Sequence, residues 1–386
     1  MKFQSLLIIS NDFPNADNTY IREIFVKEQV KYLCNYFKDI YVICPIPYGL
    51  DYLRKNRYED YTYENVHVYF PSYLNVPFFY SHFRNYWIHF ATNIIFKIIE
   101  EKNMEFDLIH AHFTWPSGAV ATRIKKRFNV PLVLTEHTSQ TFSKAINRKD
   151  PLFMEVWNTS DAIIRIRKGD IHLFKEMGVD PRKVFYVPNG YDTIIFSHLS
   201  VKECRERLHI PLEKKVILYV ANFYSEVKGH RYLIESISEL VKKRQDILCV
   251  LVGDGKLRGE LESVVNYFMF MGMRPHSEIP LWMNACDIFV LPSLNEGNPT
   301  VLFECLGSGK PFVGTKVGGI PEIIVSDDYG LLVEPGNSKK LAEAILVALD
   351  REWDSKIIID YSAQFSWEKI ADDIVNIYAN TLSQVM

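Results

Sequence analysis

Cysteine is scarce and scattered in this 386-residue chain. The six cysteines stand at positions 34, 44, 204, 249, 286 and 305, and no two form a Cys-x-x-Cys pair. This spacing argues against a disulfide framework and against a thiolate zinc site. It fits a reducing compartment, so we expect a cytoplasmic protein.

Long apolar runs are also missing. No segment approaches the roughly 20 apolar residues that a membrane-spanning helix needs. The opening "MKFQSLLIIS" has a short apolar run and no small-residue cleavage site, which favours a first β-strand over a signal peptide.

The chain has no strong excess of either charge. The formal net charge is −3, with 24 basic and 21 acidic residues up to position 195 and 20 and 26 after it. So weak a basic excess excludes a nucleic-acid partner but is compatible with an anionic ligand or a membrane surface.

Two ligand-binding patterns are absent. The segment after the expected first strand, "ISNDFPNADN", lacks the Gly-x-Gly-x-x-Gly turn of nicotinamide-dependent enzymes. Neither an Asp-x-Asp pair nor a His, Cys, Asp and Glu cluster at metal-ligand spacing occurs, so we expect no metal and no cofactor.

Short apolar runs alternate with longer amphipathic stretches, which is typical of β-α-β units and parallel sheets. We therefore expect an α/β protein with two doubly wound, Rossmann-like domains that face each other across a cleft, where ligands bind at strand carboxyl ends. The expected domains are 1–190 and 191–365, followed by a C-terminal helix, 366–386, that packs back towards the first domain. The expected strands are Ser5–Ser10, Ile40–Cys44, Leu108–Ala111, Leu132–Thr135, Ala162–Ile166, Val184–Val187, Val216–Val220, Leu248–Val252, Ile288–Leu291 and Pro311–Gly314.

The stretch "LPSLNEGNPTVLFECLGSGKP", 291–311, combines a strand, a turn and a helix. Pro299 suits the first helical position, because its missing N–H would be unpaired there. The free N–H groups around Gly297 to Val301 and the positive end of the helix dipole suit a diphosphate.

Two carboxylates flank this expected phosphate site. Glu296 lies in the turn and Glu304 more than one helical turn further on. Taken singly, each could be solvent-exposed; together they predict hydroxyl groups on both sides of a diphosphate, as in a nucleotide sugar.

The segment "PSLNEGNPTVLFECLGSGKPFVGTKVGGIPEII" closely resembles the Glu-x7-Glu segment of retaining glycosyltransferase family 4, the glycosyl transferases group 1, which have the GT-B fold. The resemblance continues through "VPNGYDTIIF", "LVGDGKLRGEL", "GLLVEPGNSKKLAEAI" and "FSWEKIADDIVNIY". It is looser in the first half, at "FVKEQVKYL", "DLIHAHFTWPSG" and "PLVLTEHTS".

The resemblance implies a retaining, metal-independent transferase in which the leaving phosphate accepts the acceptor's proton. His137, Lys228 and Glu296 would act at the reacting centre, with Lys228 stabilising the leaving diphosphate. The donor would be held by Asn222, Lys228, Glu296, Gly297, Asn298, Pro299, Thr300 and Glu304.

Three features depart from the family pattern. Asn222 stands where the family usually has an arginine, and Arg231 or Arg258 could replace it. The family's Gly-Gly pair after "NDFP" is missing, and "VVNYFMFMGMRPHSEI" is shorter than usual, which would reshape the base pocket.

The acceptor side is predicted from "SDAIIRIRKGD" and "HAHF". Arg165 and Arg167 share one face of an expected strand, so an acceptor phosphate or carboxylate could neutralise them. Pairing with Asp170 or Glu136, or exposure to water, is the alternative. His112 is the further acceptor candidate, with a structural role as its alternative.

The sequence thus predicts transfer of a sugar from a nucleotide-diphosphate sugar to a glycan or lipid-linked acceptor in cell-surface polysaccharide or glycolipid synthesis. UDP, GDP and ADP donors all stay open. A nucleotide-sugar epimerase or phosphorylase-like enzyme and a silent sugar-nucleotide-binding protein are the alternatives. The aromatic-rich segment 72–100 predicts peripheral contact with the inner face of a membrane; a core helix is its alternative.

Overall fold

The computed structural model describes residues 3–18, 23–48, 58–74, 80, 82–137, 140–257 and 267–385. The chain forms two compact units. Unit 1 comprises Met1–Pro188 and Glu368–Met386, and unit 2 comprises Asn189–Trp367. The chain therefore passes between the units at Pro188 and again at Trp367, and its C-terminal helix belongs to unit 1.

Unit 1 is built on an eight-stranded sheet in the order β10-β9-β8-β7-β1-β2-β5-β4, parallel except for β4 against β5. From β1 the chain adds β2 and β5 on one side and β7 to β10 on the other. The topological switch point of this sheet therefore lies between the paired strands β1 and β7. The strands are β1 (Phe3–Ile9), β2 (Phe37–Ile43), β4 (Tyr61–Tyr63), β5 (Val66–Tyr69), β7 (Leu108–His112), β8 (Leu132–Glu136), β9 (Ala162–Arg165) and β10 (Val184–Tyr186), with a separate pair, β3 (Ile46–Tyr48) and β6 (Ser72–Leu74).

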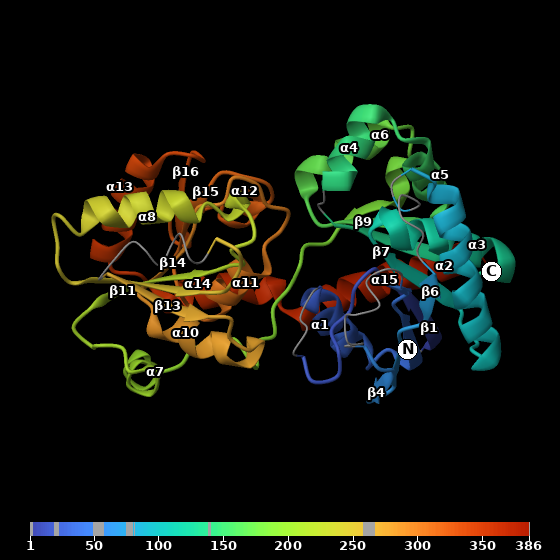
Figure 1. The fold of residues 1–386 in the computed structure, drawn as a ribbon, viewed down its shortest axis with the longest axis horizontal. Coiled ribbons are helices and arrows are strands. Elements are labelled where there is room, and N and C mark those ends of the chain that lie inside the picture. The colour runs from blue at the N-terminus through green and yellow to red at the C-terminus, as the bar shows by residue number, and fades with distance from the viewer. Residues whose placement is uncertain are drawn as a thin grey trace. The chain divides into compact units, whose positions relative to one another are not determined.

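The helices of unit 1 lie on both sides of this sheet, and all of them except α15 stand between two strands in the chain (Figure 1). They are α1 (Ile24–Leu33), α2 (Arg84–Glu101), α3 (Ala119–Phe128), α4 (Gln140–Arg148), α5 (Pro151–Thr159), α6 (Ile171–Glu176) and α15 (Trp367–Val385), with the irregular turn η1 (Thr114–Gly118).

Buried apolar runs explain the central strands. All five residues of β7 and of β8 are buried, as expected for strands covered on both faces. Each of the six strands expected in this half is present within three residues at either end. The strands between 46 and 74 were not expected, because "IPY", "YTY" and "SYL" are short and contain no aliphatic run.

Unit 2 has a six-stranded, fully parallel sheet in the order β13-β12-β11-β14-β15-β16. The chain order reverses between β11 and β14, and this switch point is where open α/β sheets bind ligands. The strands are β11 (Lys215–Val220), β12 (Ile247–Val252), β13 (Phe268–Gly272), β14 (Ile288–Leu291), β15 (Phe312–Thr315) and β16 (Gly330–Val333).

Helices cover both faces of this sheet, with α8 and α13 on one side and α10 on the other (Figure 1). The helices are α7 (Val201–Leu208), α8 (His230–Leu240), α10 (Ile279–Ala285), α11 (Thr300–Gly307), α12 (Ile320–Ile323), α13 (Ser338–Asp350) and α14 (Ser355–Ser362). The four expected strands of this half are present; β13 and β16 were missed.

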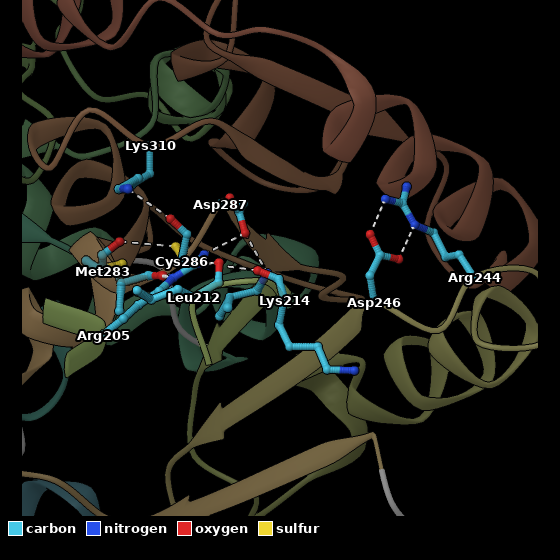
Figure 2. Close-up of polar contacts among 11 residues, drawn as sticks. Arg205, Leu212, Lys214, Arg244, Asp246, Met283, Cys286, Asp287 and Lys310 are labelled. Atoms are coloured by element: carbon cyan, nitrogen blue, oxygen red, sulfur yellow. Dashed lines mark hydrogen bonds and ion pairs between the residues drawn. The ribbon is translucent and has the colours of Figure 1, made fainter. Parts of the chain in front are cut away.

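The amino end of the second sheet is closed by buried polar contacts, shown in Figure 2. Arg205 donates to the carbonyls of Ala285, Leu212 and Lys214 and pairs with Asp287 at 2.8 Å. Buried Lys310 donates to the carbonyl of Cys286 at 2.8 Å. These side chains bind main-chain carbonyls in the turns that precede the strands. We therefore look for a ligand site at the carboxyl ends of the strands.

The C-terminal helix α15 is held in unit 1 by two tyrosines. The Tyr378 hydroxyl lies 2.6 Å from Nδ1 of His110, and both residues are fully buried. The Tyr36 hydroxyl donates to Asp372 at 2.5 Å. Helix α15 thus contributes a buried side chain that contacts strand β7 of unit 1.

Candidate active site

The loop after β14 leads into α11 at the switch point of the second sheet. Pro299 is the N-cap of α11, with φ −69° and ψ 121°, and the helix begins at Thr300. The expectation that Pro299 is the first helical residue was wrong by one position: its ψ is extended, while its carbonyl already accepts from Leu302 N–H at 3.1 Å. Gly297 and Asn298 precede this cap, so free N–H groups remain at the start of the helix.

Glu296 and Lys228 form a close pair at this helix start. Lys228 Nζ lies 2.8 and 3.0 Å from the two carboxylate oxygens of Glu296. Ser293 adds a hydrogen bond to the same carboxylate at 2.7 Å. Glu296 is only 7% exposed, so the prediction that it is more than a solvated turn residue is consistent with its surroundings.

Two glycines let three loops meet around Glu296. Gly229 adjoins Lys228, and a Cβ there would lie 1.8 Å from the carbonyl oxygen of Pro292. Gly318 has φ +59°, and a Cβ there would lie 1.8 Å from the carbonyl oxygen of Glu296. Only glycine fits either position, and the loops after β11, β14 and β15 therefore pack backbone against backbone.

The remaining donor candidates lie around this centre. Asn298 Oδ1 accepts from the N–H of Asn189 at 2.7 Å, and the Asn298 carbonyl accepts from the Asn189 side chain at 2.7 Å. Its Nδ2 is buried with no hydrogen-bond partner in the described part of the chain. Thr300 is half-buried, and Asn222 is exposed in the loop after β11.

The two suggested replacements for the missing arginine fare differently. Arg231 is exposed on α8 and pairs with Glu235 at 2.9 Å. That contact gives its charge a partner on its own helix. Arg258 lies outside the described residues, as do residues 19–22 of the first-domain loop and 264–266 of the segment expected to reshape the base pocket.

Glu304 is buried in α11 and is bound by a residue that the sequence did not single out. It is 5% exposed, and Oε1 lies 3.0 Å from Nε2 of His276. His276 stands in the turn η5 (His276–Glu278) after β13. The two residues are 28 positions apart, and no local pattern signals the contact.

Three residues predicted at the reacting centre or the acceptor side follow adjacent strands of unit 1. His112 ends β7, His137 directly follows β8, and Arg165 ends β9. His112 Nδ1 lies 3.1 Å from His137 Nε2, and both rings are buried. The sequence predicted roles for these residues at the reacting centre and on the acceptor side but did not indicate this contact.

Burial keeps both histidines neutral. It lowers the pKa of His112 to about 3 and that of His137 well below its usual value, with further lowering from His112 and Arg165 in the second case. A neutral ring carries one N–H, so one ring donates in the shared hydrogen bond. The outer nitrogens, Nε2 of His112 and Nδ1 of His137, are buried without a partner among the described residues. One of them must be a donor and the other an acceptor, which suits hydroxyl groups.

Arg165 and Arg167 both contact Asp170, which is the alternative that the sequence left open. Arg165 is fully buried; it pairs with Asp170 and donates to the Glu136 carbonyl at 2.6 Å. Arg167 lies 3.4 Å from the same carboxylate, beyond the end of β9 at Arg165. The expected strand was too long, and Asp170 neutralises Arg165 without a ligand. An acceptor role for either arginine stays a prediction.

Glu136 is a buried acid beside His137. Its carboxylate accepts from both the N–H and the hydroxyl of Thr114. Desolvation raises its pKa to about 7, while the Thr114 hydrogen bond and Arg165 act in the opposite direction. This group therefore titrates near neutral pH.

Among the residues that the structure describes, no group of three or more His, Cys, Asp or Glu side chains is arranged to hold a metal ion. None of the helices in the described ranges has the length and apolar character needed to cross a bilayer.

Two units, each built on a doubly wound and largely parallel sheet, form the GT-B fold of glycosyltransferases. The family models agree: "Glycosyl transferases group 1" matches residues 214–351 and "Glycosyltransferase Family 4" matches residues 23–194. The chain is 30% identical over 338 residues to an uncharacterized glycosyltransferase of Methanocaldococcus jannaschii, covering 84% of this chain and 88% of that protein. The chain belongs to glycosyltransferase family 4, which confirms the resemblance.

Two further comparisons extend this result. The chain is 28% identical over 321 residues to the D-inositol 3-phosphate glycosyltransferase of Corynebacterium aurimucosum, covering 76% of each protein. Its fold is similar to that of Anabaena HepE solved with UDP-glucose, with a TM-score of 0.73 at 20% identity over 97% of this chain and 99% of that chain.

Proposed function

We propose that this glycosyltransferase moves a sugar, with retention of its anomeric configuration, from a nucleoside-diphosphate sugar to a glycan or lipid-linked acceptor. The observation that carries the proposal is the Lys228–Glu296 pair at the start of α11. The Lys228 ammonium group suits the phosphate end of a sugar–phosphate bond. The Glu296 carboxylate, which accepts hydrogen bonds from hydroxyl groups, suits the sugar end.

In the proposed reaction, the bond between the sugar C1 and the diphosphate oxygen breaks while the acceptor oxygen bonds to C1 on the same face. The acceptor's proton moves to the departing phosphate. Lys228 stabilises the charge that develops on this phosphate, and the N–H groups at the start of α11 add to that stabilisation. No metal and no organic cofactor takes part in the proposal.

The other candidates take roles on either side of this centre. Glu296 accepts hydrogen bonds from the transferred sugar, and Glu304 accepts from the ribose. Gly297, Asn298, Pro299, Thr300 and Asn222 line the donor site. His137, held by His112, bonds a hydroxyl of the donor or the acceptor. The UDP-glucose complex of HepE supports a nucleotide sugar as donor.

For the acceptor, we propose a glycan or lipid-linked molecule used at the cytoplasmic face of a membrane. The name of the Corynebacterium relative includes a phosphorylated acceptor, D-inositol 3-phosphate. This supports an anionic acceptor group, for which Arg167 is the more exposed of the two arginine candidates.

Replacement of Lys228 tests the proposal. A thermal-shift panel of UDP-, GDP- and ADP-sugars first identifies the donor, because a ligand of the native state raises its stability. We expect Lys228→Ala to lower kcat by about a hundredfold or more. Lys340→Ala, which removes an exposed lysine paired with Glu343 on α13, is the control and should keep full activity.

Three results would contradict parts of the proposal. Full activity in Lys228→Ala would remove the role of Lys228. A product with the opposite anomeric configuration by NMR would contradict retention, and loss of transfer on chelation of divalent ions would contradict metal independence.

A further inference from the structure

His276 contacts Glu304 from a different part of unit 2. Glu304 lies in α11, and His276 opens the turn η5 after β13, at the far edge of the sheet order. His276 Nε2 and Glu304 Oε1 are 3.0 Å apart, with side-chain exposures of 19% and 7%. A contact this close between two largely buried polar groups restricts both side chains.

The His276 ring also packs against a buried aromatic ring. Its centroid lies 5.3 Å from that of Phe196, which is 1% exposed. Pro275 caps the turn, and its carbonyl accepts from the N–H of Glu278 at 2.9 Å. The imidazole therefore has little freedom to leave Glu304.

We propose that His276 is a positioning residue for Glu304 that sets the affinity of the enzyme for the ribose of its nucleotide. This inference rests on the proposed function. Nε2–H donates to Oε1, which fixes the plane of the carboxylate. Oε2 and the second lone pair of Oε1 then accept from the two neighbouring ribose hydroxyls.

The positioning role has a consequence that a packing role lacks. Removal of the imidazole lets the Glu304 carboxylate rotate, so it binds the ribose diol less well. The loss must depend on the ribose hydroxyls themselves. The substitution should also weaken nucleotide binding and raise KM while kcat stays unchanged, because the ribose lies away from the bond that reacts.

The test combines two substitutions with two ligands. The probe is the nucleoside diphosphate, among UDP, GDP and ADP, that most stabilises the wild-type chain, together with its 2′,3′-dideoxy form. We expect His276→Ala to weaken binding of the ribonucleotide about tenfold, as for the loss of one hydrogen bond to a charged group. Binding of the dideoxy form should change less than twofold, which isolates the coupling between His276 and the ribose hydroxyls.

A conservative variant and a control complete the design. His276→Gln keeps an N–H donor near the position of Nε2, so it should restore most of the affinity. His209→Asn changes an exposed histidine of the same unit, at a left-handed position that asparagine tolerates, and should bind like the wild type.

Two outcomes would overturn the inference: equal losses of affinity for both nucleotides in His276→Ala, or unchanged affinity for the ribonucleotide in that variant when it remains folded. A wild-type chain that binds none of the three nucleoside diphosphates would instead overturn the proposed function on which the inference rests.

Discussion

At the scale of single residues, the main feature is that the ionisable candidate residues contact one another within each unit. Lys228 pairs with Glu296 in unit 2, Arg165 pairs with Asp170 in unit 1, and His276 is hydrogen-bonded to Glu304. Buried charges are tolerated when they are paired and hydrogen-bonded. A nucleotide sugar that enters this site would therefore exchange existing contacts for new ones.

The pKa of Glu136 gives a prediction at this scale. Its folded-state pKa is raised to about 7, against an unfolded value of about 4.3. Between these two values the folded chain holds a proton that the unfolded chain has lost. The folded state is therefore progressively less favoured as pH rises from about 4.3 to 7.

Glu136→Gln, which resembles the protonated form, should avoid this loss. We expect the unfolding free energy of the variant, relative to the wild type, to rise by up to about 1.4 kcal/mol per pH unit across that window. Urea unfolding at pH 5, 6, 7 and 8 measures the difference, in which contributions from other titrating groups cancel. A difference that is flat with pH would show that Glu136 does not titrate there.

At the scale of elements, the site is made by loops that follow three adjacent strands and pack backbone against backbone. Gly229 touches the loop after β14, and Gly318 touches Glu296 in the same loop. The positions of Lys228 and Glu296 thus depend on main-chain contacts in which neither side chain takes part. A substitution at either glycine should therefore displace Glu296 or Lys228 in the candidate donor site without removing any polar side chain.

Gly318→Ala tests this dependence. Alanine would bring the cost of a left-handed φ, about 1 kcal/mol, together with a methyl group 1.8 Å from the carbonyl oxygen of Glu296. We expect a marked fall in the melting temperature and loss of nucleotide binding.

The matched control is Gly336→Ala. Gly336 also has a positive φ, of +74°, but a Cβ there meets nothing nearer than the Tyr232 hydroxyl at 3.6 Å. It should lose only about 2–4 °C and keep nucleotide binding. Equal effects in the two variants would mean that the loop contact is unimportant.

How far these elements could be predicted depends on whether the signal is local. The central strands, α11 and the carboxylates of Glu296 and Glu304 follow from short patterns of apolar residues and turns. The Lys228–Glu296 pair was predicted as a shared pocket, through the family resemblance. The Arg165–Asp170 pair, between residues five positions apart, was predicted as the alternative to an acceptor role. The His276–Glu304 contact and the His112–His137 hydrogen bond join different elements, and residue types alone do not encode such contacts. The strands β13 and β16 were missed because "FMFMG" and "GLLV" resemble a helical segment and a loop as much as strands.

At the scale of the whole molecule, helix α2 has two different faces. It buries Trp87, Ile88, Ala91 and Ile95 against unit 1, which agrees with the core-helix alternative. It also exposes Phe83, Tyr86 and Phe90, at 53%, 62% and 39%. Arg84 binds Asp150 at 2.9 Å, and the exposed cations Arg148 and Lys149 directly precede that aspartate. Aromatic rings near cations suit the headgroup region of an anionic membrane. The part of the expected membrane segment at 75–79 and 81 lies outside the described residues.

We expect the chain to bind vesicles that contain anionic lipid at low salt, and Phe83→Ser/Tyr86→Ser/Phe90→Ser to reduce this binding about tenfold or more. Sedimentation with vesicles of neutral and of anionic lipid measures both effects. Val347→Ser/Ile357→Ser, which changes exposed apolar residues of unit 2, is the control. Equal binding by the triple variant and the wild type would exclude α2 as the contact.

The return of the chain to unit 1 at Glu368 has a consequence for biosynthesis. During translation, residues 1–188 are made before unit 2, but α15, which supplies the buried partner of His110, is made after it. At about 5–20 residues per second, the ribosome needs roughly 10–35 s to add unit 2 in between. Throughout that interval the nascent unit 1 lacks the tyrosine that binds His110, whereas unit 2 is continuous in sequence. Unit 2 therefore has all of its own residues before unit 1 does, although the synthesis of unit 1 begins earlier.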